Sequence, residues 1–200
     1  MKNQPVFRPA RKEDAVQIAV LMDIASRGLV SWVWSTLAFV GQSPLEVGRT
    51  RIREMRDLPS HFSRWTILEN EDGVFGAFAG YMILDPYDPG DVSELPDVYL
   101  PLLELESLAA GCWFLMALSV FPEFRRKGFG SAMLRAAEAE ARNCEAMRMA
   151  VTVSSGNDGA LALYLRTGFK ELARRKRIQF PGSPESGDWI LLLKDVERVK

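Results

Sequence analysis

A basic segment with two glycines lies between an apolar run and a helical pattern in the middle of the chain. The apolar run, 113–120, is nearly continuous and of strand length, which is typical of a central strand buried on both faces. A helical pattern of apolar residues begins near Ser131. The segment between them carries three cations and two glycines: Arg125, Arg126, Lys127, Gly128 and Gly130. This order predicts a strand, a tight turn and a helix.

Such a turn suits the binding of a phosphate. The first N–H groups of a helix lack acceptors inside the helix, and the helix dipole adds partial positive charge there. The glycines leave room for an anion, and the cations add charge beside it. A dinucleotide fingerprint would need glycine in place of Met133, and a P-loop would need lysine in place of Ser131. An ordinary basic turn is the alternative interpretation.

The rest of the chain alternates between helical and strand patterns. Strands are predicted over 5–9, within a hairpin at 61–87, and over 113–120, 147–153, 169–180 and 189–196. Helices are predicted over 14–28, 44–57, 102–110, 131–142 and 157–168. Ser43 is the expected N-cap of the helix over 44–57, with Glu46 in its first turn. The segment 30–40 has no clean period, and its tryptophans suggest packing between helices. The alternation predicts an α/β or α+β fold around a mixed sheet.

Length, charge and cysteine content limit the possible classes of protein. The chain has 200 residues, 48% of them hydrophobic, which predicts a single domain over 1–200. A net charge of −1 argues against binding nucleic acid or a membrane through bulk positive charge. Cys112 and Cys144 lack metal-ligand spacing, so we expect two free thiols in a reducing compartment and no metal. Residues 1–11 lack the apolar core of a signal peptide and no later run could span a bilayer, which predicts a cytoplasmic protein.

Two separate blocks of sequence carry a resemblance to one family. The first block reads Val-x-Pro and then Arg-x-x-Gly-x-Gly: Val120, Pro122, Arg125, Gly128 and Gly130. The second has an asparagine, an Ala-x-x-Leu-Tyr segment and a closing Gly-Phe: Asn157, Ala160, Leu163, Tyr164, Gly168 and Phe169. In order and spacing, 113–169 resembles the GCN5-related N-acetyltransferase (GNAT) superfamily. The segment 7–28 resembles the family's first strand and helix more generally.

The resemblance implies a fold and a co-substrate. The fold is a mixed central sheet of about seven strands flanked by about four helices, in which the fourth and fifth strands splay apart. Acetyl-CoA is the implied co-substrate, with its pyrophosphate on the main chain of the glycine turn and its pantetheine arm beside the fourth strand. The implied binding residues are Leu118, Ser119, Val120, Arg125, Arg126, Lys127, Gly128, Phe129, Gly130, Ser131, Asn157 and Tyr164.

The resemblance also implies a reaction in which a neutral amine attacks the thioester directly, without an acyl-enzyme. Tyr164 matches the position that donates a proton to the departing sulfur, and packing in the helix core is its alternative role. Asn157 would bond the pantetheine, cap its helix, or do both. The backbone N–H of Val120 is the candidate donor to the oxyanion.

The sequence does not single out one general base. Glu104 and Glu106, just before the central strand, are the candidates, with solvated surface carboxylates as the alternative. His61, the only histidine, is a weaker candidate that could instead cap local structure.

For the acceptor, we expect a primary amine on a small molecule or peptide. The acidic segment 85–97 favours a cationic acceptor, and Trp32 and Trp34 could border its aliphatic part. Two alternatives remain: an N-terminal acetyltransferase of the ribosomal-protein type, and an acyl-CoA-binding module without catalysis. No nucleic-acid or membrane partner is expected, because the net charge is −1. The cations at 174–177 alternate faces on a strand, so no single surface receives all four. The resemblance implies a possible homodimer.

Overall fold

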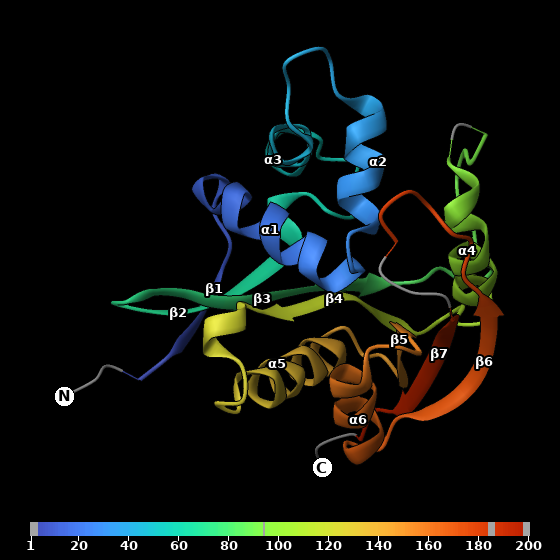
Figure 1. Cartoon of the computed structure of the whole chain (residues 1–200). Coiled ribbons are helices and arrows are strands. Elements are labelled where there is room, and N and C mark those ends of the chain that lie inside the picture. Colours follow the sequence, from blue (N-terminus) through green and yellow to red (C-terminus); the bar gives the residue numbers. More distant parts are fainter. Residues whose placement is uncertain (1–3, 94, 184–186, 198–200) are drawn as a thin grey trace. The chain divides into compact units, whose positions relative to one another are not determined.

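The computed structural model of the protein describes residues 4–93, 95–183 and 187–197. Seven strands form a mixed sheet in the order β1-β2-β3-β4-β5-β7-β6 (Figure 1). The strands are β1 Val6–Pro9, β2 Trp65–Asn70, β3 Gly73–Met82, β4 Trp113–Val120, β5 Arg148–Ser154, β6 Lys170–Lys176 and β7 Asp188–Asp195. β4 and β5 pair in parallel, whereas β1–β2, β2–β3, β5–β7 and β6–β7 pair antiparallel. The predicted fold class is therefore confirmed.

Six α-helices and four short 3-10 helices are found in the described part of the chain. The α-helices are α1 Ala15–Ser26, α2 Leu29–Leu37, α3 Pro44–Glu54, α4 Leu100–Ser107, α5 Phe129–Asn143 and α6 Asp158–Arg166. The 3-10 helices are η1 Lys12–Asp14, η2 Phe62–Arg64, η3 Asp97–Tyr99 and η4 Pro122–Phe124. The family resemblance implied about four helices. Helices α2 and α4 bring the number of α-helices in the described residues to six.

By its internal contacts the chain divides into two compact units. The first unit comprises Met1–Gly80 and Ala117–Arg135, and the second comprises Tyr81–Met116 and Ala136–Lys200. Strands β3 and β4 and helix α5 each contribute residues to both units. The single domain expected over 1–200 stays a prediction.

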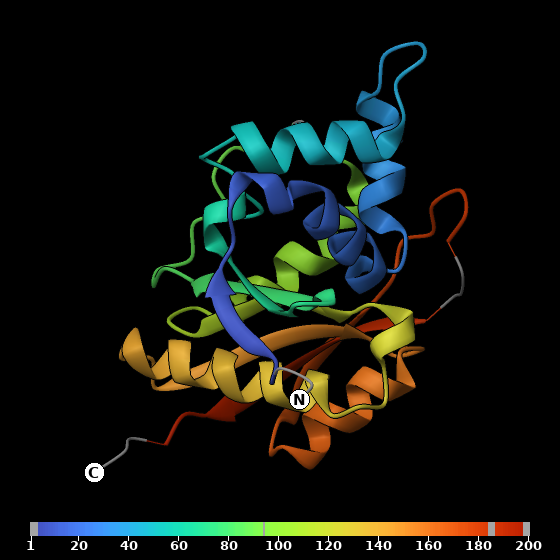
Figure 2. The ribbon, with the colours of Figure 1, turned by 90° about the vertical axis from the view of Figure 1, so that its left-hand side faces the viewer.

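In the first unit, β2 and β3 form the predicted hairpin, and three helices pack together beside it. The hairpin turns through two residues, Glu71 and Asp72. Helices α1, α2 and α3 contact one another and lie on one side of β1, β2 and β3 (Figures 1 and 2). Helix α3 starts at the predicted cap, where Ser43 N–H donates to Glu46 at 2.8 Å and Glu46 N–H donates to Ser43 Oγ at 3.3 Å. It ends at Glu54, three residues before the expected Asp57.

The aperiodic segment 30–40 is largely helix α2. Trp34 is buried, with 5% of its surface exposed, and its ring lies over Gly48 of α3. A Cβ atom on Gly48 would come within 2.4 Å of that ring, so the close packing of α2 on α3 requires a glycine. The segment 38–43 then projects away from the three helices (Figures 1 and 2).

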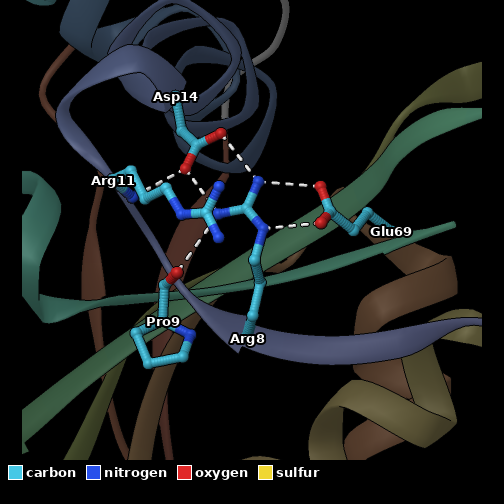
Figure 3. A network of polar contacts seen from close by, with 5 residues as sticks. All are labelled: Arg8, Pro9, Arg11, Asp14 and Glu69. Carbon is cyan, nitrogen blue, oxygen red and sulfur yellow. Dashed lines mark hydrogen bonds and ion pairs between the residues drawn. The ribbon is translucent and has the colours of Figure 1, made fainter. Parts of the chain in front are cut away.

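One guanidinium group joins β1, β2 and the start of the first helical segment. Arg8 donates to both Glu69 oxygens, at 2.6 and 2.7 Å, and to both Asp14 oxygens, at 2.7 and 2.9 Å (Figure 3). Asp14 Oδ2, which lies 2.7 Å from Arg8, also accepts the backbone N–H of Arg11 at 2.7 Å. Bonds from Arg8 lower the pKa of Asp14 and of Glu69 below their ordinary values. The two acids therefore stabilise the fold in their ionised form.

Replacing Arg8 by methionine is expected to lower the free energy of unfolding at pH 7 by about 1–3 kcal/mol, because two shielded carboxylates lose a charged donor. Because the folded-state pKa values are depressed, this contribution is present above the unfolded pKa values, 3.8 for Asp14 and 4.5 for Glu69, and is lost as the pH falls below them. Urea unfolding at several pH values measures it. The difference between wild type and variant should shrink in acid.

Arg53→Met is the matched control. Its ion pair with Glu54 is solvent-exposed on both sides, so the expected loss is below about 1 kcal/mol. An equal loss in both variants would mean that the network around Arg8 adds nothing beyond an ordinary surface pair.

In the second unit, α4 and α6 lie on opposite faces of β5, β7 and β6 (Figures 1 and 2). Helix α4 contacts β6 and β7, and α6 contacts β5. Arginines of the 174–177 run make internal contacts: Arg174 pairs with Glu171 at 2.8 Å and Arg175 pairs with Glu104 at 2.5 Å. Arg177 is buried over the ring of Trp189, 4.6 Å from its centroid. These contacts favour a structural role for the run.

No helix in 4–93, 95–183 and 187–197 is both long and apolar enough to cross a membrane. The cytoplasmic location stays a prediction.

Candidate acetyl-CoA and proton-transfer sites

The predicted strand, turn and helix are all present in the glycine segment. Strand β4 ends at Val120, and α5 begins at Phe129. Between them Arg126 has a φ of 61° and Gly128 a φ of 84°, so the chain reverses through the left-handed region. The helical hydrogen-bond ladder starts with Ala132 N–H on Gly128 C=O at 3.0 Å. The N–H groups at 129–131 precede that ladder and are available to an external acceptor.

The side chains of the turn are mostly exposed, and three of them are cationic. Arg125, Arg126, Lys127 and Gly128 are exposed, and Gly130 and Ser131 are half-buried. In the described part of the chain, Arg126 has no side-chain hydrogen bond or ion pair, and Lys127 lies 5.2 Å from the centroid of Phe124. The turn therefore combines backbone donors, a helix N-terminus and cations, which is the chemistry of an anion site.

Three phenylalanines hold the turn against the hairpin. Phe75 of β3 stacks on Phe129 with centroids 4.8 Å apart and meets Phe124 edge-on at 4.7 Å. Phe121 N–H donates to Phe75 C=O at 3.0 Å. Sequence reasoning missed Phe75, because only the pairing of β3 with β4 brings it to the turn.

The end of β4 approaches β3 unusually closely. A Cβ atom on Gly76 would lie 2.4 Å from Ser119 O and 3.2 Å from Val120 Cα, so only glycine fits there. Ser119 is buried, while Leu118 and Val120 are half-buried. Arg125 Nε donates to Val120 C=O at 3.2 Å.

The pairing of β4 with β5 stops before either strand ends. The last pair is Leu115 with Val151, although β4 continues to Val120 and β5 to Ser154. This early end of the ladder agrees with the splay that was expected between the fourth and fifth strands. In the described part of the chain, the register of β4 with β5 therefore covers only Trp113 to Leu115.

Two predicted residues, Asn157 and Tyr164, belong to α6 and its cap. Asn157 Oδ1 accepts Ala160 N–H at 3.3 Å, so the capping role is present. Tyr164 is buried, with 5% of its surface exposed, and its ring packs on Phe169 at 5.5 Å between centroids. Among the described residues, no group hydrogen-bonds to the Tyr164 hydroxyl. Burial raises the pKa of Tyr164 above its ordinary value, so the phenol stays protonated at neutral pH.

The two candidate bases on α4 have different surroundings. Glu104 is exposed and pairs with Arg175. Glu106 is half-buried, and burial raises its pKa, although hydrogen bonds from Tyr87 and Tyr81 oppose the rise. Of the two, Glu106 has the properties expected of a general base, because burial raises its pKa above the ordinary value.

The remaining candidates are two tryptophans of α2 and the histidine before η2. Trp34 is buried between α2 and α3, and Trp32 is half-buried on α2. His61 is buried, and its Nδ1 lies 2.8 Å from Ser63 Oγ at the start of η2, which fits the capping role. Within the described ranges, no group of three or more His, Cys, Asp or Glu could hold a metal ion.

The site residues fall into both units. The β4–α5 turn with its flanks, Trp32 and Trp34 belong to the first unit, and Glu104, Glu106, Asn157 and Tyr164 belong to the second. The binding and catalytic roles assigned to all of them stay predictions.

Comparisons with known proteins identify the family. A model described as "Acetyltransferase (GNAT) family" matches residues 26–169. The N-acetyltransferase from Staphylococcus aureus Mu50 superposes with a TM-score of 0.63 at 16% identity, covering 94% of this chain and 100% of that chain. Ribosomal-protein-alanine N-acetyltransferase from Brucella melitensis gives 0.61 at 20% identity, covering 95% and 99%. The protein yncA from Salmonella typhimurium, solved with its cofactor acetyl-CoA, gives 0.59 at 15% identity, covering 99% and 97%.

At these identities the likeness to solved structures is a likeness of fold. No curated protein matches the chain significantly. The family model, in contrast, spans well over half of the sequence. The chain therefore belongs to the acetyltransferase (GNAT) family, and its predicted enzyme class, an acyltransferase, is confirmed.

Proposed function

We propose that the protein transfers an acetyl group from acetyl-CoA to a primary amine of a small molecule or peptide. The observation that carries this proposal is the turn between β4 and α5, where N–H groups that precede the helical ladder lie beside exposed cations. A diphosphate needs such donors, and Gly128 leaves its approach open because nothing lies within 4 Å of a Cβ atom built there. The residues present thus fit the coenzyme's diphosphate.

Residues outside the turn would bind the pantetheine arm. Main-chain groups of Leu118 to Val120 would pair with the pantetheine arm, because the β4–β5 ladder ends before them. The side chain of Asn157 keeps its NH2 group for the same arm or for a water while its oxygen caps α6. When bound, acetyl-CoA supplies the acetyl group as a thioester.

Two side chains of the second unit would move the protons. Glu106 accepts a proton from the acceptor ammonium, which frees the nitrogen lone pair for attack. As the C–N bond forms and the C–S bond breaks, the Tyr164 hydroxyl gives its proton to the sulfur. The second proton of the nitrogen then restores the phenol. The overall change releases one free thiol and one proton for each amide formed.

The acceptor is proposed to be cationic. Exposed Asp85, Asp88, Asp91 and Asp97 make no ion pair within the described part of the chain, so their negative charge remains available to attract such a molecule. Peptide N-termini remain an alternative acceptor, in keeping with the likeness of fold to a ribosomal-protein-alanine N-acetyltransferase. Thiol release from acetyl-CoA against polyamines, amino acids, aminoglycosides and short peptides distinguishes these acceptors.

Charge reversal at the turn tests the proposed binding site. The double variant Arg126→Glu and Lys127→Glu is expected to weaken acetyl-CoA binding at least tenfold, about 1.4 kcal/mol, because two cations beside the diphosphate become anions. Both side chains are exposed, so the fold should be unaffected. Isothermal titration calorimetry at low and moderate salt measures the change, which should diminish as salt rises.

Arg49→Glu, an exposed cation on α3, is the matched control. It should leave acetyl-CoA affinity unchanged. Equal affinity in the double variant and wild type would rule out this turn as the coenzyme site. Binding in wild type without thiol release from any amine would favour the acyl-CoA-binding module.

A further inference from the structure

Two tyrosines from outside α4 converge on Glu106. Tyr87, in the segment after β3, donates its hydroxyl to Glu106 Oε2 at 3.3 Å. Tyr81, near the end of β3, is the second donor to this carboxylate, and its ring lies 5.7 Å from that of Phe114. All four residues belong to the second unit. Glu106 is therefore held from two segments that precede its own helix in sequence.

We propose that Tyr87 is a positioning residue for the acetyl transfer, fixing the Glu106 carboxylate by its hydrogen bond and favouring the ionised form that accepts the acceptor's proton. This inference rests on the proposed function of Glu106. Tyr87 itself would touch neither acetyl-CoA nor the amine. Its effect would pass entirely through Glu106.

Glu104, on the same helix, has a different kind of partner from Glu106. Glu104 lies two residues earlier on α4, where it faces Arg175 of β6 at 2.5 Å and 59% of its side chain is exposed. Residues two apart on a helix point in different directions, so one helix presents one carboxylate to a cation and one to phenols. Glu104 is thus part of an exposed ion pair, whereas Glu106 is shielded from solvent and held by neutral donors.

The groups that face Glu106 determine in which direction its pKa changes when the Tyr87 hydroxyl is removed. Within the described part of the chain, the influences on Glu106 are its burial, Tyr81 and Tyr87, while Asp88 acts on Tyr87. Burial and the charge of Glu106 raise the pKa of Tyr87 to about 12, so its hydroxyl remains a donor throughout neutral pH. Donation to the carboxylate lowers the pKa of Glu106, and burial raises it. Loss of the donor therefore raises the pKa of Glu106 further.

Tyr87→Phe tests the proposal. The acidic limb of kcat/KM for thiol release, recorded between about pH 5 and 9, is expected to move to higher pH by about one unit. The rate on the plateau should change less than the limb. Tyr99→Phe removes a phenolic hydroxyl from η3 and is the matched control, for which no shift is expected. A direct readout is the carbon-13 titration of the Glu106 carboxylate, whose signal is assigned by its loss in Glu106→Gln.

The outcomes separate this proposal from the proposed function. A rise in both the Glu106 titration and the kinetic limb supports the positioning role. An unchanged Glu106 titration in folded Tyr87→Phe overturns it. A raised titration with an unmoved limb also overturns it and removes Glu106 as the base. Lack of thiol release by wild type would defeat the proposed function, and with it the role of Tyr87 in that reaction, even if the titration showed the hydrogen bond to be intact.

Discussion

Tyr164→Phe is expected to lower kcat for thiol release by about 10²–10⁴-fold while acetyl-CoA affinity is retained. The expected size is that of general acid catalysis, because the departing thiolate loses its proton donor. The phenol is buried and its pKa is raised, so it is protonated at every pH of interest. In the described part of the chain no partner bonds to its hydroxyl, and the ring still packs on Phe169. The substitution should therefore leave the fold intact.

Single-turnover and steady-state thiol release measure the loss in Tyr164→Phe, and calorimetry measures acetyl-CoA binding. Tyr99→Phe again serves as the hydroxyl-deletion control. An unchanged kcat in Tyr164→Phe would assign the residue to helix packing alone. A loss of affinity equal to the loss of kcat/KM would point to binding rather than proton transfer.

Gly76→Ala is expected to lower the free energy of unfolding by about 3 kcal/mol, at the upper end of overpacking effects. The new Cβ atom would lie 2.4 Å from Ser119 O, and a backbone atom cannot rotate away as a side chain can. The two strands must move apart, and this displaces the end of β4. That end lies beside the β4–α5 turn, which is the proposed acetyl-CoA site. Acetyl-CoA affinity should therefore fall together with stability.

Gly159→Ala provides a control of opposite sign. Gly159 lies in α6, and nothing is within 4 Å of a Cβ atom built there. Alanine at such a site should raise stability by about 0.5–1 kcal/mol. Urea unfolding of both variants measures the difference. Equal stability of Gly76→Ala and wild type would contradict the close approach of β3 and β4.

Local signals in the sequence predicted much of the fold. Strand β4 was confirmed over its full length, because a nearly continuous apolar run of this length is typical of a strand buried on both faces. The capping pair of Ser43 and Glu46 located the start of α3. Gly168 closes the segment after α6 with a φ of 94°, as expected for a glycine at that position. These features depend on neighbours in sequence.

Features that depend on distant residues were not predictable in the same way. The sequence of helix α2 lacks a clear hydrophobic period. Trp34 is buried because its ring packs over Gly48, which lies on α3. The role of Phe75 at the turn depends on strand pairing. Glu104 and Glu106 looked equivalent in sequence. The packing of α4 against β6 gave Glu104 a cation, whereas β3 and the segment after it gave Glu106 two phenols.

The bond from Arg125 to Val120 C=O means that this carbonyl already has a ligand supplied by the chain itself. A carbonyl oxygen has two lone pairs, so an incoming donor can share this oxygen with the guanidinium group or replace it. In the second case the dissociation constant of the incoming molecule reports an exchange of one donor for another. A guanidinium group displaced in this way would become an additional cation beside the turn, available to an anionic group of the same incoming molecule.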